Sequence, residues 1–213
     1  MNQRGQVFLY GSGGHAKVVM DILRLKGAAV AAMLDDDESR MNVDVMGAPV
    51  VHPEQALQTL KDQNVLYGII AIGSNRIRME KAVLIRSRGY ELLTAVHPSA
   101  VISDGASIGL GTVVMAGSVV NWDAKIGENV ILNTNCTVEH DAWIGDGVHL
   151  SPGVNVGGGA RIGEGSHIGI GATVLPRVTI GADVIVGGGS VVIKDIPDGA
   201  TAVGVPARII KQG

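Results

Sequence analysis

The sequence has a single cysteine, Cys136, and only 3% of its 213 residues are aromatic. One cysteine cannot form an intramolecular disulfide, so a reducing compartment fits the chain. The scarcity of rings suits a narrow interior filled by Val, Ile and Ala side chains. At this length we expect one large domain or two modest ones.

An excess of positive charge is also missing. The formal net charge of −3 argues against nucleic acid or an anionic membrane as the main partner. No segment contains the eighteen or more apolar residues of a membrane span. Residues 1–17 lack the pattern of a signal peptide, because their apolar run is short and leads into glycines. We therefore expect a cytoplasmic protein without a membrane partner.

A six-residue repeat occupies the chain from Ile102 to Val192. Every sixth residue is Ile, Val or Leu at sixteen consecutive positions, and the residue two places earlier is always small or β-branched. A helix of 3.6 residues per turn does not give this period, and a plain alternating strand does not restart every six residues. The repeat is typical of a parallel β-helix, in which three hexads form one coil and the sixteen hexads form about five. Glycine often follows the aliphatic residue, as at Gly109 and Gly127, and we expect it to support turn conformations that are costly for larger residues. A glycine-rich tract without a fold is the alternative, but composition alone rarely keeps so many aliphatic residues in phase.

The residues before the repeat read as a small α/β unit. A strand at 6–10, a glycine turn at 11–15 and a helix at 16–26 leave free backbone N–H groups that suit phosphate. A second strand at 28–34 ends in four acidic residues, 35–38, and an acid about twenty residues after such glycines can bind a ribose or sugar hydroxyl.

Further elements are expected as helices at 53–60 and 76–88 and strands at 66–72 and 90–96. We therefore predict a Rossmann-like domain over residues 1–92, with about four parallel strands. We predict that residues 93–213 form the second domain, an all-β domain built as a parallel β-helix. The six-residue period fails at Asp198, so the remaining tail is expected to cap the last coil.

One outward-facing histidine in the repeat is the strongest candidate for chemistry. His140 lies outside both inward-facing series, and Asp141 follows it directly. Gly158, eighteen residues later and therefore stacked on it, has no side chain to cover the imidazole. His149 and His167 are also eighteen apart and should share one column. These spacings do not form a compact set of zinc ligands, so we expect no metal.

Five motifs together carry a family resemblance. They are YGSGGHAK at 10–17, LDDD at 34–37, IAIGSN at 70–75, NTNCTVEHDAWIGDGVHLSPG at 133–153 and GVPAR at 204–208. Over about residues 6 to 210 the chain resembles the sialic-acid and bacillosamine acetyltransferase family of left-handed β-helix sugar acyltransferases. The resemblance implies a left-handed helix, a homotrimer, acetyl-CoA in the groove between adjacent prisms and a UDP-linked amino sugar held by the α/β domain.

The resemblance also implies roles for individual residues. His140 is the expected general base, and Asp141 takes the place of an acidic neighbour that supports it. The expected contacts to the sugar nucleotide are Gly13, Gly14, His15, Asp35, Asp36, Gly73 and a further contact, Ile85. The expected contacts to acetyl-CoA are His149, Ile170 and Gly188.

The implied reaction is acetylation of the 4-amino group of a UDP-linked amino-deoxy sugar. The amine must be neutral to attack the thioester, and a histidine is suited to removing its proton near neutral pH. Direct transfer requires no covalent intermediate. Cys136 lies on an inward series and is a poor candidate for a nucleophile. Two alternatives remain open: O-acetylation of sialic acid or another sugar hydroxyl by the same base, and a non-catalytic trimeric scaffold.

Overall fold

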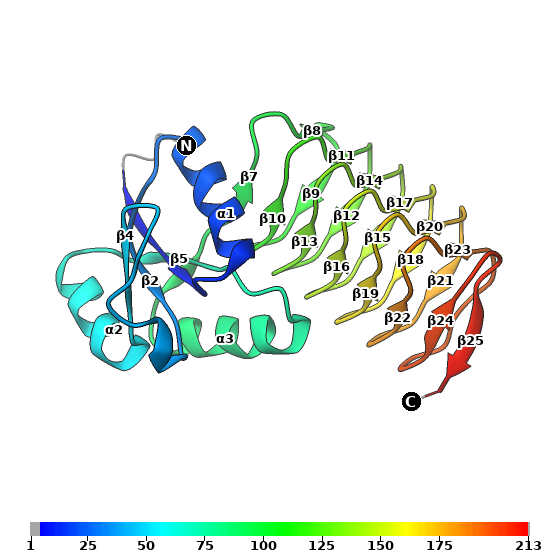
Figure 1. Cartoon of the computed structure of the whole chain (residues 1–213). Coiled ribbons are helices and arrows are strands. Elements are labelled where there is room, and N and C mark those ends of the chain that lie inside the picture. Colours follow the sequence, from blue (N-terminus) through cyan, green and yellow to red (C-terminus); the bar gives the residue numbers. More distant parts are fainter. Residues whose placement is uncertain (1–4, 213) are drawn as a thin grey trace. The chain divides into compact units, whose positions relative to one another are not determined.

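A computed structural model describes residues 5–212, and the chain divides into two compact units (Figure 1). Unit 1 comprises residues 1–98 and unit 2 comprises residues 99–213. The boundary predicted at residue 92 falls at the end of a short strand, β6 (Glu91–Leu92). The predicted fold class, a Rossmann-like α/β unit followed by a left-handed parallel β-helix, is confirmed.

Unit 1 is built on a sheet with the strand order β3-β4-β2-β1-β5-β6. Its strands are β1 (Gln6–Tyr10), β2 (Ala29–Leu34), β3 (Asp44–Val45), β4 (Ala48–Val51), β5 (Tyr67–Ile70) and β6 (Glu91–Leu92). The pairs around β1 are parallel, whereas β3 pairs with β4 antiparallel. The β3–β4 hairpin was not predicted. Its turn residues Met46 and Gly47 both have positive φ, 55° and 83°, as the tightest hairpin turns require.

Three helices cover this sheet: α1 (Gly14–Leu25), α2 (Pro53–Asp62) and α3 (Asn75–Ser87). In α1, Ala16, Val19 and Leu23 recur at helical spacing and are buried. Pro53 opens α2 at a position where no N–H bond is lost. Side chains of α2 and α3 form one core with Phe8 and other residues of the sheet. A short 3-10 helix (Glu38–Arg40) and the strand β7 (Ala95–Val96) complete the described elements of unit 1.

Unit 2 consists of two-residue strands, one for each hexad (Figure 1). They are β8 (Val101–Ile102), β9 (Ser107–Ile108), β10 (Val113–Val114), β11 (Val119–Val120), β12 (Lys125–Ile126), β13 (Ile131–Leu132), β14 (Thr137–Val138), β15 (Trp143–Ile144), β16 (His149–Leu150), β17 (Asn155–Val156), β18 (Arg161–Ile162), β19 (His167–Ile168), β20 (Thr173–Val174), β21 (Thr179–Ile180), β22 (Ile185–Val186) and β23 (Val191–Val192). Each strand pairs in parallel with the strand eighteen residues away, as Val120 does with Val138. All aliphatic positions of the repeat beyond Ile108 are buried, so they fill the axis of the prism.

Small residues of the second series satisfy the backbone at the corners. Thr112 Oγ1 donates to the carbonyl of Gly127, and it also accepts a hydrogen bond from the amide of Val130. Three coils further along the same corner, Ser166 Oγ makes the same two bonds: it donates to the carbonyl of Gly181 and accepts from the amide of Val184. Hydroxyl-bearing residues therefore fit this buried series because they supply a bond where the chain turns.

A second six-residue series carries the turns themselves. From Gly111 to Gly189, every sixth residue has a positive φ, between 52° and 74°. These residues are Gly, Asn or Asp except for Arg177, because other side chains clash in the left-handed region. The glycines that follow the aliphatic residues have a different role from the predicted one. A Cβ on Gly109 would lie 2.5 Å from the backbone of Gly127, so glycine is needed there for close contact between coils.

The last coil is two residues shorter than the others. Ile180 bridges to Ile196 and Val186 pairs with Ala202, each sixteen residues away instead of eighteen. Ile196 thus takes the inward position that the period assigned to Asp198. The strand β24 (Thr201–Val203) continues one face, and β25 (Arg208–Lys211) pairs with it antiparallel. The predicted cap is therefore a hairpin that covers the open edge.

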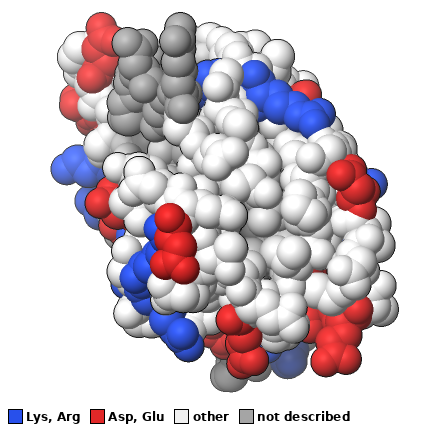
Figure 2. Space-filling model, turned by 90° about the vertical axis from the view of Figure 1, so that its left-hand side faces the viewer, with Lys and Arg blue, Asp and Glu red and all other residues white. Residues whose placement is uncertain are grey.

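Charged side chains are interspersed on the molecular face shown in Figure 2, where no extended area of one sign is visible among the described residues. Of the helices in residues 5–212, none is long and apolar enough to cross a bilayer.

Candidate active site

His140 lies at the prism corner between β14 and β15. Its carbonyl accepts a hydrogen bond from the amide of Gly159 at 2.9 Å, which fixes the backbone, while its side chain is 67% exposed. Its Nδ1 lies 2.8 Å from Oδ2 of Asp141. When Nδ1–H donates to this carboxylate, Nε2 carries the free lone pair and can accept a proton. Asp141 sits in the left-handed turn position with a φ of 60°, so one residue both shapes the corner and orients the imidazole.

Three consecutive glycines form the same corner in the next coil. A Cβ on Gly158 would lie 2.8 Å from Cε1 and Nε2 of His140, so the edge of the ring rests over bare backbone, as predicted. A Cβ on Gly157 would lie 2.6 Å from the nitrogen of Pro176, and Gly159 has a φ of 67°. Each glycine thus has its own steric reason, and Gly158 adds no side chain over the Nε2 edge of an imidazole that is 67% exposed.

A polar pair supports the corner from the preceding coil. Nδ2 of Asn121 donates to Oε2 of Glu139 at 2.8 Å, directly before His140. Sequence reasoning did not identify this pair, although its spacing of eighteen residues was available as a signal.

His149 and His167 stack in one column, as predicted. Their ring centroids are 4.8 Å apart. Nε2 of His149 lies 3.2 Å from Nδ2 of Asn133, and Nε2 of His167 lies 3.1 Å from Oγ of Ser151. The two contacts repeat the same offset one coil apart, which holds both imidazoles in fixed orientations.

The two other residues predicted to contact acetyl-CoA lie beside each other in successive coils. Ile170 is 66% exposed, and a Cβ on Gly188 would lie 3.2 Å from its carbonyl oxygen. An exposed apolar side chain next to bare backbone is suited to a flat or extended ligand.

In unit 1 the glycine turn opens α1 beside a cavity of about 280 Å³. Gly13, Gly14, Lys17 and Arg40 contribute to its lining. A Cβ on either glycine would meet no atom within 4 Å, so their backbones are open to a ligand. Amide groups at the start of α1 and two nearby cations make this turn an anion-binding arrangement.

Asp35 braces that turn. Its Oδ2 accepts hydrogen bonds from the amide and hydroxyl of Ser12, at 3.0 and 2.5 Å. Nη1 of Arg40 donates to the same hydroxyl at 2.9 Å. Much of the Asp35 carboxylate is therefore used to shape the turn.

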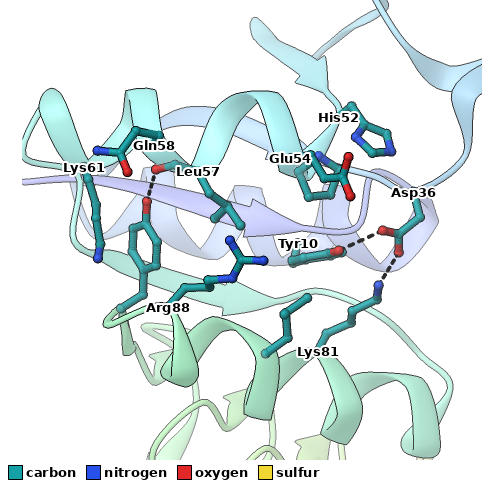
Figure 3. Close-up of a pocket in the computed structure, with 12 residues that line it drawn as sticks. Tyr10, Asp36, His52, Glu54, Leu57, Gln58, Lys61, Lys81 and Arg88 are labelled. Carbon is teal, nitrogen blue, oxygen red and sulfur yellow. Dashed lines mark hydrogen bonds and ion pairs between the residues drawn. The ribbon is translucent and has the colours of Figure 1, made fainter.

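The next residue, Asp36, belongs to a second cavity of about 440 Å³ between α2 and α3 (Figure 3). Its Oδ1 accepts from the hydroxyl of Tyr10 at 2.8 Å, and its Oδ2 lies 2.7 Å from Nζ of Lys81. Burial works against the charge of Asp36, but the bonds from Lys81 and Tyr10 lower its pKa below the usual value. Burial is also the main reason that the pKa of Tyr10 rises to about 12. The two predicted aspartates thus serve different cavities.

His15 follows the glycines and is partly buried. Burial, and then the charge of Arg78, lower the pKa of His15 to about 4, so the imidazole is neutral near pH 7. Its Nε2 is enclosed and has no hydrogen-bond partner among the described residues.

Arg78 itself is only 1% exposed and was not predicted. It donates to the carbonyls of Ile72 and Gly73 at 3.0 and 3.2 Å and to Oδ1 of Asn75 at 2.9 Å. These bonds fix the turn between β5 and α3, which contains the predicted contact Gly73. An arginine on a helix normally reads as a solvated residue, so the sequence offered no signal for this role.

Ile85 and Cys136 are both enclosed. Ile85 is fully buried in the core of unit 1, so its side chain lines neither cavity described above.

Cys136 is also fully buried, and burial raises the pKa of its thiol to about 11, as expected for an inward residue that is a poor nucleophile. Within residues 5–212 no group of three or more His, Cys, Asp or Glu side chains is placed to hold a metal ion.

Comparisons with known proteins match both units. Residues 6–83 match the PglD N-terminal domain family, and residues 123–158 and 159–194 match the bacterial transferase hexapeptide (six repeats) family. Among curated proteins, the chain is similar to UDP-N-acetylbacillosamine N-acetyltransferase from Bacillus subtilis (strain 168), with 41% identity over 113 residues. That alignment covers 51% of the chain and 50% of the relative, so it spans half the relative's length.

Solved structures extend the similarity over the whole chain. PerB from Caulobacter crescentus, in complex with CoA and GDP-perosamine, is 44% identical, covers 98% of both chains and has a TM-score of 0.93. Two further structures of that perosamine N-acetyltransferase carry a histidine replaced by Asn or by Ala. The acetyltransferase domain of PglB from Neisseria gonorrhoeae is 37% identical, with a TM-score of 0.88 and coverage of 96% of this chain and 99% of that one. It has also been solved with acetyl coenzyme A.

Proposed function

The chain belongs to the sialic-acid and bacillosamine acetyltransferase family of left-handed β-helix sugar acyltransferases, and from this premise we propose that it acetylates the amino group of a nucleotide-linked amino sugar with acetyl-CoA. Two lines of support converge. Relatives that align over almost the whole chain are a perosamine N-acetyltransferase solved with CoA and an acetyltransferase domain solved with acetyl coenzyme A. The chain also has an outward imidazole, His140, whose side chain is 67% exposed.

The observation that carries the proposal is the corner formed by His140, Asp141 and Gly158. The amine attacks the thioester carbonyl, the C–N bond forms, and the amine proton passes to Nε2 of His140 as the CoA thiolate leaves. Asp141 stabilises the imidazolium that results, since its carboxylate lies 2.8 Å from Nδ1. The proton then passes on to the leaving thiolate or to solvent. The histidine variants of the perosamine enzyme show that a histidine of that relative has been a target of study.

The acetyl-CoA contacts proposed for unit 2 are His149, Ile170 and Gly188. His149 is fixed by Asn133, and the other two present an exposed apolar side chain and bare backbone. We propose that the cosubstrate lies along the prism in the groove between adjacent subunits of a homotrimer.

The nucleotide sugar is proposed to bind at the glycine turn of unit 1. Its diphosphate would face Gly13 and Gly14 at the start of α1, while neutral His15 and the turn at Gly73 flank it. The proposed acceptor is the 4-amino group of a deoxy sugar. Two carriers are candidates: UDP, expected from the sequence resemblance and named for the curated relative, and GDP, present in the PerB complex.

A thiol-release assay tests the proposal. Acetyl-CoA and a nucleotide-linked 4-amino sugar should release CoA, and His140→Asn should lower kcat by about 10²-fold to 10⁴-fold. Binding of CoA, measured by calorimetry, should be retained. Asp123→Asn is the matched control, because Asp123 occupies the same turn position one coil earlier.

The alternatives give different results in the same assay. Release of CoA with sialic acid or its nucleotide ester, but with no amino sugar, would favour O-acetylation. No release with any sugar would favour a scaffold. A His140→Asn variant with full activity would remove the imidazole from the mechanism.

A further inference from the structure

The cavity between α2 and α3 is lined by charged groups that take no part in the acetyl transfer itself. Asp36 and Glu54 line it as acids, and Lys61, Lys81 and Arg88 line it as bases. Its volume of about 440 Å³ is larger than that of the cavity at the glycine turn. A site of this size with both donors and acceptors is suited to a polar ring system.

Two of these charged side chains have no protein partner. Glu54, in the first turn of α2, and Arg88, at the end of α3, make no side-chain hydrogen bond or ion pair with any residue of the described chain. Asp36, by contrast, is bonded to Tyr10 and Lys81. In Figure 3 the guanidinium of Arg88 points into the cavity between Leu57 and Tyr10, and Glu54 stands at the end nearer Asp36.

The helix ends explain part of this arrangement. An acid in a first turn and a base after a last turn complement the helix dipole, and both are common on surfaces. That effect accounts for the sign of each charge. It does not explain the direction of the Arg88 side chain, which belongs to an exposed residue and yet extends into the cavity towards the buried Tyr10.

One end of the cavity, at Tyr10, Asp36 and Glu54, lies at the same sheet edge as the glycine turn. Tyr10 ends β1 and lines the cavity, and Ser12 and Gly13 line the other site two and three residues later. Asp35 and Asp36, after β2, divide between the two sites in the same way. We therefore assign the diphosphate of one nucleotide to the glycine turn and its base to this cavity, because both sites begin at this edge.

Hydrogen-bond chemistry distinguishes the candidate bases. Guanine presents two adjacent N–H donors, N1 and N2, to one carboxylate, and the acceptors O6 and N7 to a guanidinium. Uracil has one N–H between two carbonyl oxygens, which a carboxylate repels. An unpartnered carboxylate and an unpartnered guanidinium in one cavity therefore complement guanine better than uracil.

Resting on the proposed function, we infer that the cavity between α2 and α3 binds a guanine base through Glu54 and Arg88, so that the acceptor is a GDP-linked amino sugar. Asp36, held by Tyr10 and Lys81, forms the wall beside the ribose. The nucleotide specificity of the enzyme then resides in α2 and at the end of α3, away from the acetyl-transfer groups.

Binding of free nucleotides tests the inference directly. Calorimetry on the full-length protein should show that GDP binds at least about tenfold more tightly than UDP, since one bidentate contact contributes about 1–3 kcal/mol of discrimination. Inosine diphosphate, which lacks only the 2-amino group, should bind about tenfold less tightly than GDP. Glu54→Ala should weaken GDP to the level of inosine diphosphate and leave inosine diphosphate less affected.

Matched controls come from α3. Glu80→Ala and Arg76→Ala remove a carboxylate and a guanidinium that pair with each other at 2.8 Å and do not line the cavity, so neither should change the preference for GDP. Arg88→Ala should weaken GDP and inosine diphosphate alike. Tighter binding of UDP than of GDP, or an equal effect of Glu54→Ala on GDP and inosine diphosphate, would overturn the inference.

Turnover separates this inference from the proposed function. CoA release with a UDP-linked but not a GDP-linked amino sugar would keep the acetyltransferase and reject the guanine site. Release with neither would reject the proposed function, and the nucleotide preference would still decide the cavity.

Discussion

Asp141 illustrates how one residue meets two demands. Its backbone has a φ of 60°, a conformation that Asp tolerates better than most residues. Its side chain lies 2.8 Å from Nδ1 of His140. The short carboxylate is sufficient for this bond because both residues lie on one tight corner. The sequence resemblance implied an acidic neighbour that supports the imidazole, and Asp141 lies at hydrogen-bond distance from it.

Asp141→Asn tests the charge without disturbing the turn. Asn also tolerates the left-handed region, so the fold should be kept. A hydrogen bond to a charged group contributes about 1.5–3 kcal/mol, so kcat for CoA release should fall about 10-fold to 100-fold. The KM for acetyl-CoA should stay near the wild-type value. Asp141→Gly keeps the turn and removes the side chain entirely, and it should be at least as slow as Asn. An Asn variant with the wild-type kcat would show that the carboxylate does not assist the base.

His15 gives a pH dependence of stability whose sign is fixed by its lowered pKa. The folded pKa is about 4, whereas an unfolded histidine titrates near 6.5. Between these values the unfolded chain binds the extra proton, so His15 should destabilise the fold as pH falls from about 6.5 to about 4, by up to about 3 kcal/mol. Above pH 7 it should contribute no pH dependence. Thermal unfolding of wild-type and His15→Gln proteins across this range measures the difference. Equal pH profiles for the two proteins, or an NMR titration of His15 near pH 6.5, would contradict the assignment.

At the scale of residues, the sequence predicted the outward-facing side chains of the β-helix more readily than the buried charged side chains of unit 1. The outward position of His140 follows from the six-residue repeat, and the bare surface at Gly158 follows from the eighteen residues of one coil. Arg78 and the Tyr10–Asp36–Lys81 contacts depend on how distant elements of unit 1 pack, and no short-range period encodes that packing. Ile85 was assigned from resemblance to a contact, yet its helical spacing with other apolar residues fits the core position that it has.

The elements of unit 2 were the most predictable part of the chain, because the period of the repeat can be read directly from the aliphatic positions. The β-helix, its parallel register and its burial follow from the aliphatic series. The shortened final coil was missed because it lacks two residues, which shifts the six-residue repeat. The repeat assigned the inward position to Asp198, whereas Ile196 occupies it. The β3–β4 hairpin of unit 1 was missed because its strands are short and Met46 is an unusual residue for a position with positive φ.

The left-handed turn series makes Arg177 an exception with a measurable cost. It has a φ of 63°, and its side chain makes no hydrogen bond or ion pair within the described chain. A left-handed conformation costs an ordinary residue about 1–2 kcal/mol, and Asn and Gly less. Arg177→Asn should therefore raise the free energy of unfolding of unit 2 by about 1 kcal/mol, measured by thermal or denaturant unfolding. Arg161→Asn is the control, because Arg161 lies in a strand, where Asn is disfavoured. A destabilised Arg177→Asn protein would mean that the arginine side chain has a stabilising role of its own.

At the scale of the whole molecule, a β-helix gives its ligand sites little depth. The prism interior is filled by aliphatic side chains, and the residues proposed to contact acetyl-CoA are exposed or half-buried on its flanks. A thioester held against one such flank would stay open to water. Closed rings of identical subunits solve this problem by pairing different faces of neighbouring copies. The homotrimer proposed for this chain therefore has a chemical reason in addition to the family resemblance.

Mixed trimers test whether the site is shared between subunits. The purified protein should have three times the 22.0 kDa mass of one chain in light scattering. His140→Asn removes the base, and Gly188→Glu places a charged side chain at the proposed acetyl-CoA contact, so each variant alone should be inactive. If base and cosubstrate contact come from different subunits, co-expressed variants should form some intact sites and recover about a quarter of the wild-type rate, the random fraction for a head-to-tail ring. The variants mixed after separate purification as trimers are the control, and they should stay inactive until subunits exchange. No recovery on co-expression would place His140 and Gly188 of each site on one chain, and a monomeric protein with full activity would remove the shared groove altogether.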